Sequence, residues 1–477
     1  MTEATSSSLV SPQAALLQVL ALAGLPPEVA GWARLSGAEP VLPSSFAVGT
    51  ASQVAVAAAA LAACALGVQR GQPPQAVAVD MRHAALECSA WHSLDGQVRD
   101  PWDTFSGLYR AADGWVRIHA NFAHHRAGAL RLLGLDPATA TRAQAEQAVA
   151  PWKALALETA AADAGLVVTA LRSFAAWDAT PQGQALAAQP LFTIDRIAAA
   201  GADAPPRSLP PLADTDRPLA GIRVLELTRI LAGPVGGRAL AAYGADVLLV
   251  NGPHLPNIAA IADTSRGKRS ALLDLRTDDG RATLGRLLQD THVFVQGYRP
   301  GGLAARGFGP QDAAAARPGI VYVSLSAYGT QGPWAGRRGY DSLVQTAMGF
   351  NHAEGEAAGE GKPRPMPMQI LDEATGYLVA MGAAAALYRQ QREGGSWLVQ
   401  VSLAQTAHWL RGLGRVVNGF AGGTAAPAFG PQLQPYLETS ASGFGALRYP
   451  RHSAVLERTP AHWPLPSMPP GSHPAAW

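Results

Sequence analysis

The feature that most constrains the fold is a regular alternation of apolar runs and helical segments in the second half of the chain. GIRVLEL, which begins at Gly221, joins aliphatic and β-branched residues and is typical of a buried strand. A turn, TRILAGP, and a helical segment from Val235 to Tyr243 separate it from a second such run, GADVLLV. Further runs, SALLDL, THVFVQ and GIVYVSL, alternate with helical stretches such as DDGRATLGRLLQD. Because successive β-α units place their strands parallel, the pattern predicts an α/β fold with a doubly wound parallel sheet.

The first half has a different pattern, and a proline-rich segment separates it from the second. In WDTFSGLYRAADGWVRIHANF, the pair Asp113-Gly114 divides two alternating stretches, which predicts a β-hairpin in a smaller α+β unit. Residues 201–218 contain five prolines and no regular hydrophobic period, as expected of a semi-rigid linker. The chain is therefore predicted to have two halves.

The two halves share a weak internal repeat. AVAVDMRHAA at 76–85 aligns with LVQVSLAQTA at 398–407, and the same offset of 322 residues relates Arg70 to Arg392. Both copies have the order alanine-rich helix, arginine, turn, strand and helix. At this offset Thr50 corresponds to Asp372, so the first copy lacks an acid that the second copy has.

The composition fits a globular protein with large buried helices, because 48% of the 477 residues are hydrophobic and 15% are charged. A formal net charge of +2 gives no indication of a nucleic-acid partner. The N-terminus lacks the pattern of a signal peptide, and the apolar runs Val54 to Val68 and Gly376 to Tyr388 are shorter than the roughly 17 residues of a membrane span. Cys64 and Cys88 have no CxxC spacing. We expect a cytoplasmic protein with two ordinary buried thiols and no membrane partner.

Two adjacent carboxylates, Asp372 and Glu373, precede an almost uncharged helix that is predicted to start near Gly376. Asp is a favoured N-cap residue, because its side chain accepts a hydrogen bond from a free backbone N–H. A carboxylate at a helix N-terminus is also kept ionised by the helix dipole, as the nucleophile of a covalent acyl transfer must be. The structural and the catalytic interpretation are compatible.

Other candidate sites give weaker signals. The turn TRILAGP joins a strand to a helix, where backbone N–H groups can bind phosphate, but it lacks the GxGxxG pattern. Lys268, Arg269 and Arg299 would ordinarily be solvated surface charges. The twelve histidines show no HxxxH or HExxH spacing, so no metal site is predicted. No GxSxG elbow of a Ser-His-Asp hydrolase follows a strand.

Motifs of the second half, taken in order, resemble one family. They are PLAGIRVLELTRILAGP, GADVLLV, SRGKRSALLDL, THVFVQGYRPGGLAARGFG, RPGIVYVSLSAYGTQGP, GYDSLVQTAMGF and LDEATGYLVAMGAAAALYRQQREGG. These motifs, spread over about 190 residues, resemble the class III CoA-transferases, which include formyl-CoA transferase and carnitine CoA-transferase and have 2-methylacyl-CoA racemase among their relatives. The resemblance implies a Rossmann-like large domain and a smaller α+β domain.

The first half resembles the rest of the same family in an unusual order. Residues 54–90 are similar to the helix and strand that follow the family's catalytic Asp, and YRAADGWVRIHANF is similar to the start of its small domain. Family dimers consist of two interlinked chains, so we expect a homodimer; the rearranged order can satisfy the same contacts within one chain or between two. The implied organisation is a degenerate partial large-domain repeat at 1–95, a small α+β domain at 96–200, the linker at 201–218, a Rossmann-like CoA-binding catalytic domain at 219–425, and a C-terminal return segment at 426–477.

The resemblance also implies an activity. Asp372 matches the family's nucleophilic Asp, which attacks a donor thioester to give an acyl anhydride and free CoA thiolate. The thiolate then attacks to leave CoA on the aspartate, and an acceptor carboxylate takes the CoA. The implied partners are an acyl-CoA and a carboxylic acid, with coenzyme A as a substrate and no permanently bound cofactor. Substrate and CoA binding is placed at Ile230, Leu231, Ala232, Lys268, Gly297, Tyr298, Arg338 and Tyr340.

Among these positions, Ile230 to Ala232 match backbone contacts to CoA, and Lys268 and Arg338 match basic residues that face its phosphates. Gly297 and Tyr298 stand where the family usually has Asn-Phe beside the CoA. Tyr340 occupies the place of the catalytic His of the racemases.

Three departures from the family pattern leave two alternatives open. Asn251 follows the second strand where members commonly have Glu, Gln296 replaces a Glu, and Leu231 replaces the Gln of the first loop. Without an imidazole at Tyr340, two-base racemisation lacks a partner for Asp372. The alternatives to acyl-CoA transfer are a racemase or isomerase of 2-substituted acyl-CoA that uses another base, and a catalytically decayed CoA-binding paralogue.

Overall fold

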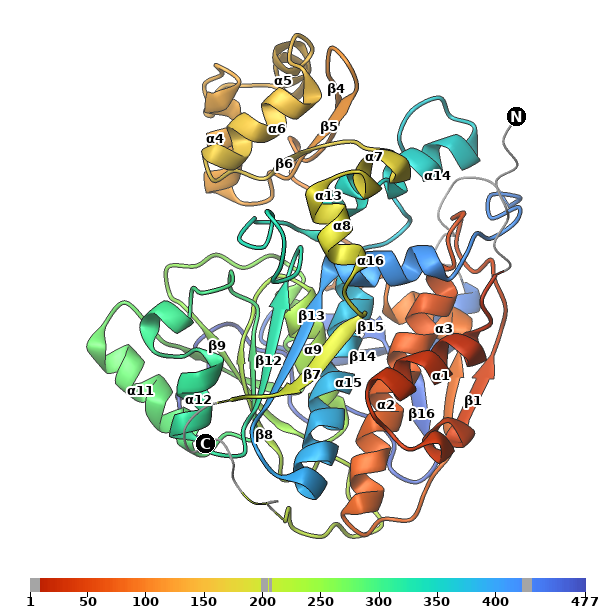
Figure 1. The fold of residues 1–477 in the computed structure, drawn as a ribbon, viewed down its shortest axis with the longest axis vertical. Coiled ribbons are helices and arrows are strands. Elements are labelled where there is room, and N and C mark those ends of the chain that lie inside the picture. The colour runs from red at the N-terminus through yellow and green to blue at the C-terminus, as the bar shows by residue number, and fades with distance from the viewer. Residues whose placement is uncertain (1–8, 199–204, 206–207, 423–430) are drawn as a thin grey trace.

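The computed structural model describes residues 9–198, 205, 208–422 and 431–477. Within these residues, the largest sheet has seven strands in the order β10-β9-β8-β11-β12-β13-β7 (Figure 1). Neighbouring strands are parallel, except that β7 is antiparallel to β13. The strands are β7 (Phe192–Arg196), β8 (Arg223–Leu227), β9 (Asp246–Asn251), β10 (Lys268–Leu272), β11 (Val293–Gln296), β12 (Val321–Ser326) and β13 (Trp397–Ser402). The predicted doubly wound α/β fold is confirmed.

Apolar side chains cover both faces of this sheet. Successive residues of a strand point to opposite faces, so Val224 of β8 belongs to one core and Leu225 to the other. The first core contains α9 (Ala232–Ala242) and α15 (Ile370–Glu393), and the second contains α11 (Asp278–Gln289) and α12 (Pro310–Ala316). The helical segments predicted from Val235 and Asp278 therefore form, and both faces of the parallel strands are buried.

The internal repeat is present in the structure. α2 (Val48–Gln69) starts 322 residues before α15, and α3 (Met81–Glu87) starts 322 residues before α16 (Leu403–Gly412). β2 (Val77–Asp80) corresponds to the end of β13 at the same offset. α2 and α15 pack directly against each other (Figure 1).

α2 and α15 are long and apolar enough to cross a membrane by length and composition, but 94% and 100% of their most apolar windows are buried inside the protein. They form the centre of the core, as predicted from the apolar runs within them. Both helices are longer than those runs.

Each repeat receives an edge strand from the other half of the chain. β7, which follows the first repeat, pairs antiparallel with β13, where Ile194 lies opposite Val399. β16 (Ala454–Leu456), which follows the second repeat, pairs antiparallel with β2, where Leu456 lies opposite Val77. Val77 and Val399 are equivalent positions of the repeat, so the two exchanged strands have the same register. In this structure the interlinking of the halves therefore occurs within one chain.

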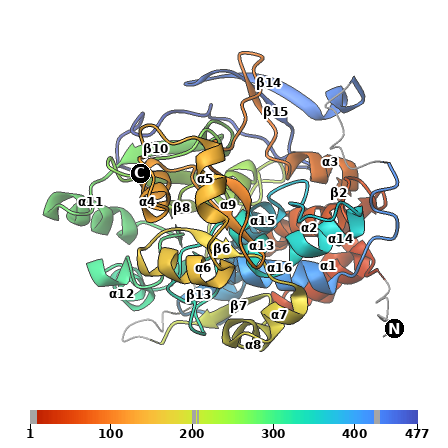
Figure 2. The same cartoon turned by 90° about the horizontal axis from the view of Figure 1, so that it is seen from above.

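A small α+β unit lies above the carboxyl ends of the parallel strands (Figures 1 and 2). Its sheet consists of β4 (Gly107–Arg110), β5 (Trp115–Ile118) and β6 (Val168–Ala170), and β4 and β5 form the hairpin predicted around Asp113-Gly114. The sheet packs on α13 (Asp341–Ala347) of the large domain. β7 falls in the range predicted for the small unit but belongs to the large sheet. The helices of the unit are α4 (Ala123–Leu132), α5 (Arg142–Val149) and α6 (Ala154–Asp163).

Two further three-stranded sheets complete the fold, with strand orders β1-β2-β16 and β14-β15-β3. The second of these contains the C-terminal hairpin, which is drawn at the edge of the molecule in Figure 2. The remaining strands are β1 (Ala33–Ser36), β3 (Ser93–Leu94), β14 (Leu437–Ser442) and β15 (Gly445–Pro450); the remaining helices are α1 (Pro12–Leu22), η1 (Pro27–Trp32), α7 (Phe174–Asp178), α8 (Pro181–Ala187), α10 (Ile261–Thr264), η2 (Ala304–Arg306), α14 (Phe350–Ala358) and η3 (Pro431–Tyr436).

The predicted linker is only partly described, because residues 201–204, 206 and 207 lie outside the described residues. Its described part has no helix or strand and contacts the turn after α2, where Gln72 donates hydrogen bonds to the carbonyl oxygens of Ala213 and Asp216. The described part of the C-terminal segment returns to the large domain, where the Trp463 indole N–H donates to the carbonyl of Arg238.

Candidate active site

A pocket of about 310 Å³ opens where the chain order of the sheet reverses, between the carboxyl ends of β8 and β11. Ligands of doubly wound folds bind at this switch point, because the loops after the two strands lead in opposite directions. Five of the nine predicted site residues line this pocket: Ile230, Gly297, Tyr298, Arg338 and Tyr340. They come from the loops that follow β8, β11 and β12, so the fold brings together residues that are distant in the sequence.

The turn after β8 has a strained backbone. Ile230 has φ of 79°, a left-handed conformation that costs energy in a β-branched residue. The following helix, α9, has no side-chain cap, so its first backbone N–H groups are free for a ligand. The side chains of Leu231 and Ala232 are buried and do not line the pocket. The backbone contacts of Leu231 and Ala232 with CoA remain a prediction.

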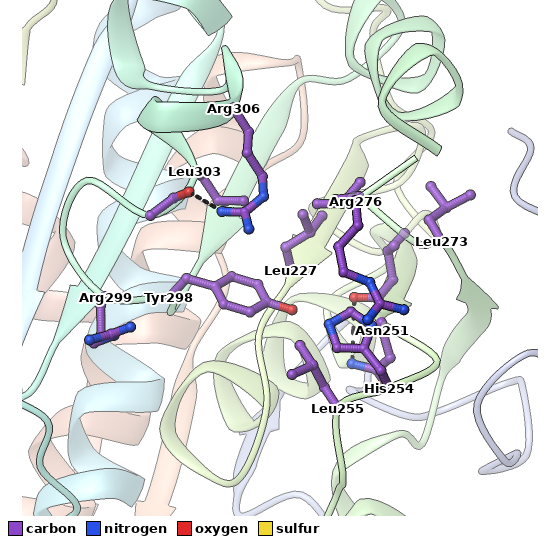
Figure 3. A pocket seen from close by; sticks show the side chains of 14 residues that line it. Leu227, Asn251, His254, Leu255, Leu273, Arg276, Tyr298, Arg299, Leu303 and Arg306 are labelled. Carbon is purple, nitrogen blue, oxygen red and sulfur yellow. Dashed lines mark hydrogen bonds between the residues drawn. The ribbon is translucent and has the colours of Figure 1, made fainter. Parts of the chain in front are cut away.

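A second pocket, of about 260 Å³, adjoins the first and shares Leu227, Leu255, Tyr298 and Arg299 with it. Figure 3 shows Tyr298 pointing across this pocket toward Asn251 and Arg276. Its described lining residues include no carboxylate. They do include four basic groups, His254, Arg276, Arg299 and Arg306. Only Arg299 of these four was considered from the sequence, because isolated basic residues in loops form no recognisable motif.

Asp372 lies in the first turn of α15, which begins at Ile370 and not near Gly376 as predicted. It is therefore not the N-cap residue, a position that Gln369 occupies without a side-chain cap bond. The Asp372 side chain keeps 9% of its surface exposed. It also acts electrostatically on Tyr340, a residue of the pocket wall. Asp372 is thus close to Tyr340, but it does not itself line either pocket.

A second carboxylate, Asp341, lies against Asp372 and was missed as a site residue. Its Oδ2 accepts the backbone N–H of Asp372 at 3.0 Å, and its Oδ1 accepts the Gln345 side-chain amide at 2.5 Å. Burial and the Asp341 charge raise the pKa of Asp372 well above its usual range. Burial raises the pKa of Asp341 to about 6. The expected ionising effect of the helix N-terminus is outweighed here by desolvation and a like charge. In the sequence, the only sign of this second carboxylate is the Asp of the motif GYDSL.

The small unit contributes the far wall of the pocket through α4. His124 and His125 line it, and His119 stacks on Tyr340 with ring centroids 4.1 Å apart. Arg117 of β5 is 4% exposed and its Nε and Nη1 have no hydrogen-bond partner. These residues were not predicted, although His124-His125 is the one adjacent histidine pair in the sequence.

Lys268 lies away from both pockets. Its ammonium group is completely buried, with Nζ 2.8 Å from Glu226 Oε2 and 2.7 Å from the carbonyl oxygen of Pro234. The structure therefore brings Lys268 to a buried ion pair beneath α9, neither to a CoA phosphate site nor to the solvated surface. Gly237 permits this pair, because a Cβ there would lie 2.9 Å from the Lys268 Nζ.

Glu373 is neither a helix cap nor exposed to solvent. Its side chain is fully buried, and Oε2 lies 3.7 Å from Nη2 of Arg238. Burial raises the pKa of Glu373 well above its usual range, and the Arg238 charge opposes this shift. Arg238 is also paired with Asp263, and Glu87 accepts a hydrogen bond from Tyr377 at 2.7 Å. Glu373 therefore belongs to a buried polar network that joins α9, α10, α15 and α3.

The equivalent position in the first repeat has no acid, but its surroundings are similar. Thr50, in the first turn of α2, donates its backbone N–H to Glu39 Oε1 at 2.7 Å. Asp372 donates its backbone N–H to a carboxylate in the same way. The first repeat thus keeps the carboxylate that accepts the helix N–H but has the fully buried Thr50 in place of the candidate nucleophile.

Among the described residues, no group of three or more His, Cys, Asp or Glu side chains is placed to hold a metal ion. Cys64 and Cys88 are free and buried, as predicted. Burial raises the pKa of Cys64 to about 12, so neither thiol has the character of a reactive thiolate.

Comparison with known proteins relates the second half of the chain to one family. Residues 219–435 match the family model described as CoA-transferase family III. A "probable fatty acyl-CoA transferase" of Mycobacterium tuberculosis is 34% identical over 211 residues, which are 41% of this chain and 53% of the relative. A crystal structure of the same mycobacterial protein matches with 33% identity and a TM-score of 0.39, covering 42% of this chain and 58% of that one.

Two further relatives extend the comparison. An "acyl-CoA transferase" of Gibberella moniliformis is 32% identical over 314 residues, or 62% of this chain and 55% of the relative. A "succinate–glutarate CoA-transferase" of Agrobacterium fabrum is 34% identical over 205 residues, or 39% of this chain and 51% of the relative. The chain thus spans about half the length of the curated relatives it matches. By the family model and these relatives, residues 219–435 are similar to CoA-transferase family III.

Proposed function

We propose that this protein is an acyl-CoA transferase that moves CoA from a thioester donor to a free carboxylate, with Asp372 as the nucleophile. The observation that carries the proposal is the location of Asp372 close to Tyr340, a residue that lines the pocket at the switch point of the sheet. The match of residues 219–435 to the model of CoA-transferase family III supports the same reaction class.

CoA would extend across the two adjoining pockets. Its phosphates would bind near Arg299 and Arg306, because these basic side chains line that pocket, whereas Arg276 is already paired with Asp274. The thioester would lie next to Tyr340, within reach of Asp372. Tyr298, which both pockets share, would contact the middle of the molecule.

The reaction would proceed in four covalent exchanges. The Asp372 carboxylate attacks the thioester carbonyl, an acyl anhydride forms, and the carbon–sulfur bond breaks to release CoA thiolate. The thiolate attacks the Asp372 carbonyl, which forms an enzyme thioester and releases the donor acid. The acceptor carboxylate then attacks this thioester, and the released thiolate finally attacks the acceptor carbonyl, which regenerates Asp372.

Exclusion of water is needed because an anhydride hydrolyses readily. The residues that follow Asp372 in α15 are packed tightly against α9. A Cβ at Gly376 would lie 2.6 Å from the carbonyl oxygen of Ala232, so only glycine permits this approach. The helix behind Asp372 is fully buried from Ala374 to Leu387. These contacts would keep water away from the inner side of the anhydride.

The function is tested by transfer of CoA from an acyl-CoA to a ¹³C-labelled carboxylate. Asp372→Asn should lower the transfer rate by at least about 10³-fold, since it removes the nucleophile. Asp279→Asn, a change of an exposed Asp on α11, is the matched control and should keep the wild-type rate. Equal rates for the two variants would overturn the proposed role of Asp372.

The pairing of strands within the chain bears on the oligomeric state that catalysis requires. The strand exchange within one chain supports a complete site in a single chain, so we propose that catalysis does not require a second copy. The predicted homodimer and the predicted cytoplasmic location stay predictions. The mass of the active protein in solution tests the predicted homodimer.

A further inference from the structure

The side-chain amide of Gln345 on α13 is held in one orientation by the backbone that leads into α15. Its Oε1 accepts the backbone N–H of Met366 at 3.1 Å, and its Nε2 donates to the carbonyl oxygen of Met368 at 3.3 Å. A backbone N–H can only donate a hydrogen bond, and a backbone carbonyl can only accept one. These two contacts therefore assign the oxygen and the nitrogen of the amide.

The amide of Asn351 on α14 supports the same orientation. Its Nδ2 donates to Gln345 Oε1 at 3.1 Å, and its Oδ1 accepts the hydroxyl of Thr346 at 2.6 Å. The side chains of Gln345, Thr346 and Asn351 are fully buried. Turning the Gln345 amide around would leave the N–H groups of Asn351 and Met366 without this acceptor, which is costly in a buried site.

As a result, Asp341 has a hydrogen-bond donor at each carboxyl oxygen. Gln345 Nε2 donates to Oδ1 at 2.5 Å, and the backbone N–H of Asp372 donates to Oδ2 at 3.0 Å. Hydrogen bonds of this kind favour the ionised form of a carboxyl group. Arg117, the cation that faces Asp341 from β5, favours the same form. Among the described residues, by contrast, no donor is hydrogen-bonded to the side chain of Asp372.

The two carboxyl groups therefore differ in their tendency to ionise. Burial raises the pKa of Asp341 to about 6, whereas burial and the Asp341 charge raise the pKa of Asp372 well above its usual range. The other titratable groups beside Asp372 are Tyr340 and Glu373. Burial raises the pKa of each, and the Asp372 charge raises it further, so neither supplies a positive charge to Asp372. At neutral pH the pair carries one negative charge, and this charge lies on Asp341.

We propose that Gln345 is a positioning residue that keeps the negative charge of the carboxyl pair on Asp341 and leaves the proton on Asp372 in the free protein. The inference rests on the proposed function, because it concerns the state of the proposed nucleophile before a thioester binds. Asp372 becomes reactive only when it gives this proton to solvent. Gln345 lines neither pocket and acts through Asp341. It thereby contributes to the pH at which the nucleophile is available.

The order of ionisation is measured by ¹³C NMR of the protein labelled at the aspartate carboxyl carbons, between about pH 4 and pH 9. Asp341→Asn and Asp372→Asn assign the two signals, and wild-type Asp341 should ionise at the lower pH. Gln345→Leu removes the donor, so the midpoint of Asp341 should rise by about one pH unit or more. Gln311→Leu, at the exposed start of α12, is the matched control and should leave both midpoints unchanged. An unchanged Asp341 midpoint in Gln345→Leu would overturn the inference.

A pair of substitutions that relocates the charge separates this role from a purely structural one. In Asp341→Asn the new amide would face the Gln345 amide donor to donor, and in Gln345→Glu two carboxyl groups would face each other. Asp341→Asn/Gln345→Glu restores a donor–acceptor pair and places the charge one hydrogen bond further from Asp372.

The double variant should have a higher thermal midpoint than either single variant, because the hydrogen bond is restored. Its rate of adduct formation on the peptide containing Asp372, measured by mass spectrometry in a single turnover, should rise at a lower pH than that of the wild-type protein. If the rate profile returned to that of the wild type together with the stability, Gln345 would only support the fold, and the inference would be wrong.

The NMR titration does not require turnover, so it separates the inference from the proposed function. If Asp341 ionises first and responds to Gln345→Leu, but no acyl-CoA forms an adduct at Asp372, the proposed function fails and the inference holds. If adducts form but Asp372 ionises first in the wild-type protein, the inference is wrong and the proposed function holds.

Discussion

The backbone N–H of Asp372 donates a hydrogen bond to Oδ2 of Asp341 at 3.0 Å, so two buried carboxyl groups lie together at the start of α15. The groups that face this pair are Arg117 of β5, Tyr340, Gln345 of α13 and Glu373 of α15. Within this arrangement Asp341 would set the protonation state of the proposed nucleophile without reacting itself.

Asp341→Asn should therefore shift the pH dependence of acylation. The reaction needs the ionised form of Asp372, so its rate rises as pH increases through the pKa of that group. Burial and the Asp341 charge raise this pKa, and removal of the charge should lower it. The rise in rate should move to lower pH in the variant. The measurement is the single-turnover rate of adduct formation between about pH 4 and pH 9; an unchanged profile would exclude a role for the Asp341 charge.

The same variant should change the pH dependence of stability. The pKa of Asp341 is raised by burial to about 6 in the folded protein, so its contribution to stability is present at low pH and is lost as pH rises through 6. Asn does not titrate. The free energy of unfolding of Asp341→Asn relative to wild type should increase between about pH 4 and pH 7, measured by urea denaturation. A constant difference across this range would contradict the assignment.

Lys268→Met distinguishes a structural from a phosphate-binding role. The substitution leaves the fully buried Glu226 without its partner, and an unpaired buried charge typically costs about 3–5 kcal/mol. The thermal midpoint should fall clearly, and Lys268→Met/Glu226→Gln should recover much of the loss. If Lys268 faced a CoA phosphate, the single variant would raise KM for the acyl-CoA and leave the thermal midpoint nearly unchanged.

Gly376→Ala tests the close packing of α9 against α15. The added Cβ would lie 2.6 Å from the Ala232 carbonyl oxygen and 2.7 Å from the Val235 side chain, and such overpacking typically costs about 1–3 kcal/mol. Gly285→Ala, on α11 with no atom within 4 Å of the new Cβ, is the control and should be neutral or stabilising by up to about 1 kcal/mol. Chemical denaturation compares the free energies of unfolding of the two variants. Equal values would show that α15 moves to accommodate the added methyl group.

The sequence predicted the large sheet well, because each parallel strand is buried on both faces and appears as a short continuous apolar run. The repeat also predicted the equivalence of α2 and α15, since their first residues, Val48 and Ile370, differ by the same offset. The exchange of β7 and β16 could not be predicted, because strand pairing at a sheet edge depends on contacts between residues that are distant in the chain.

The candidate site was predicted only in part. Loop residues that follow strands, such as Gly297 and Tyr298, do line the pocket, since the topology of the sheet determines where those loops meet. Lys268 does not line the pocket, and the sequence could not show this, because a charged residue in a sequence looks solvated and only the fold reveals a buried partner. Asp341 was missed because its role depends on contact with Asp372 across 31 residues of sequence.

Racemisation is tested separately by deuterium exchange. Burial raises the pKa of Tyr340 to about 12, so this residue is a poor second base at neutral pH where the racemases have His. The protein should therefore incorporate no deuterium at the α-carbon of a 2-methylacyl-CoA in D₂O. Incorporation that disappears in Asp372→Asn would favour the racemase alternative.

Covalent modification of Asp372 during turnover is measured by mass spectrometry of the protein after incubation with an acyl-CoA panel and proteolysis. If Asp372 is the nucleophile, the peptide that contains it should carry an acyl or CoA adduct, and Asp372→Asn should carry none. CoA binding without any adduct at this peptide, across donors of different length and charge, would contradict this role of Asp372.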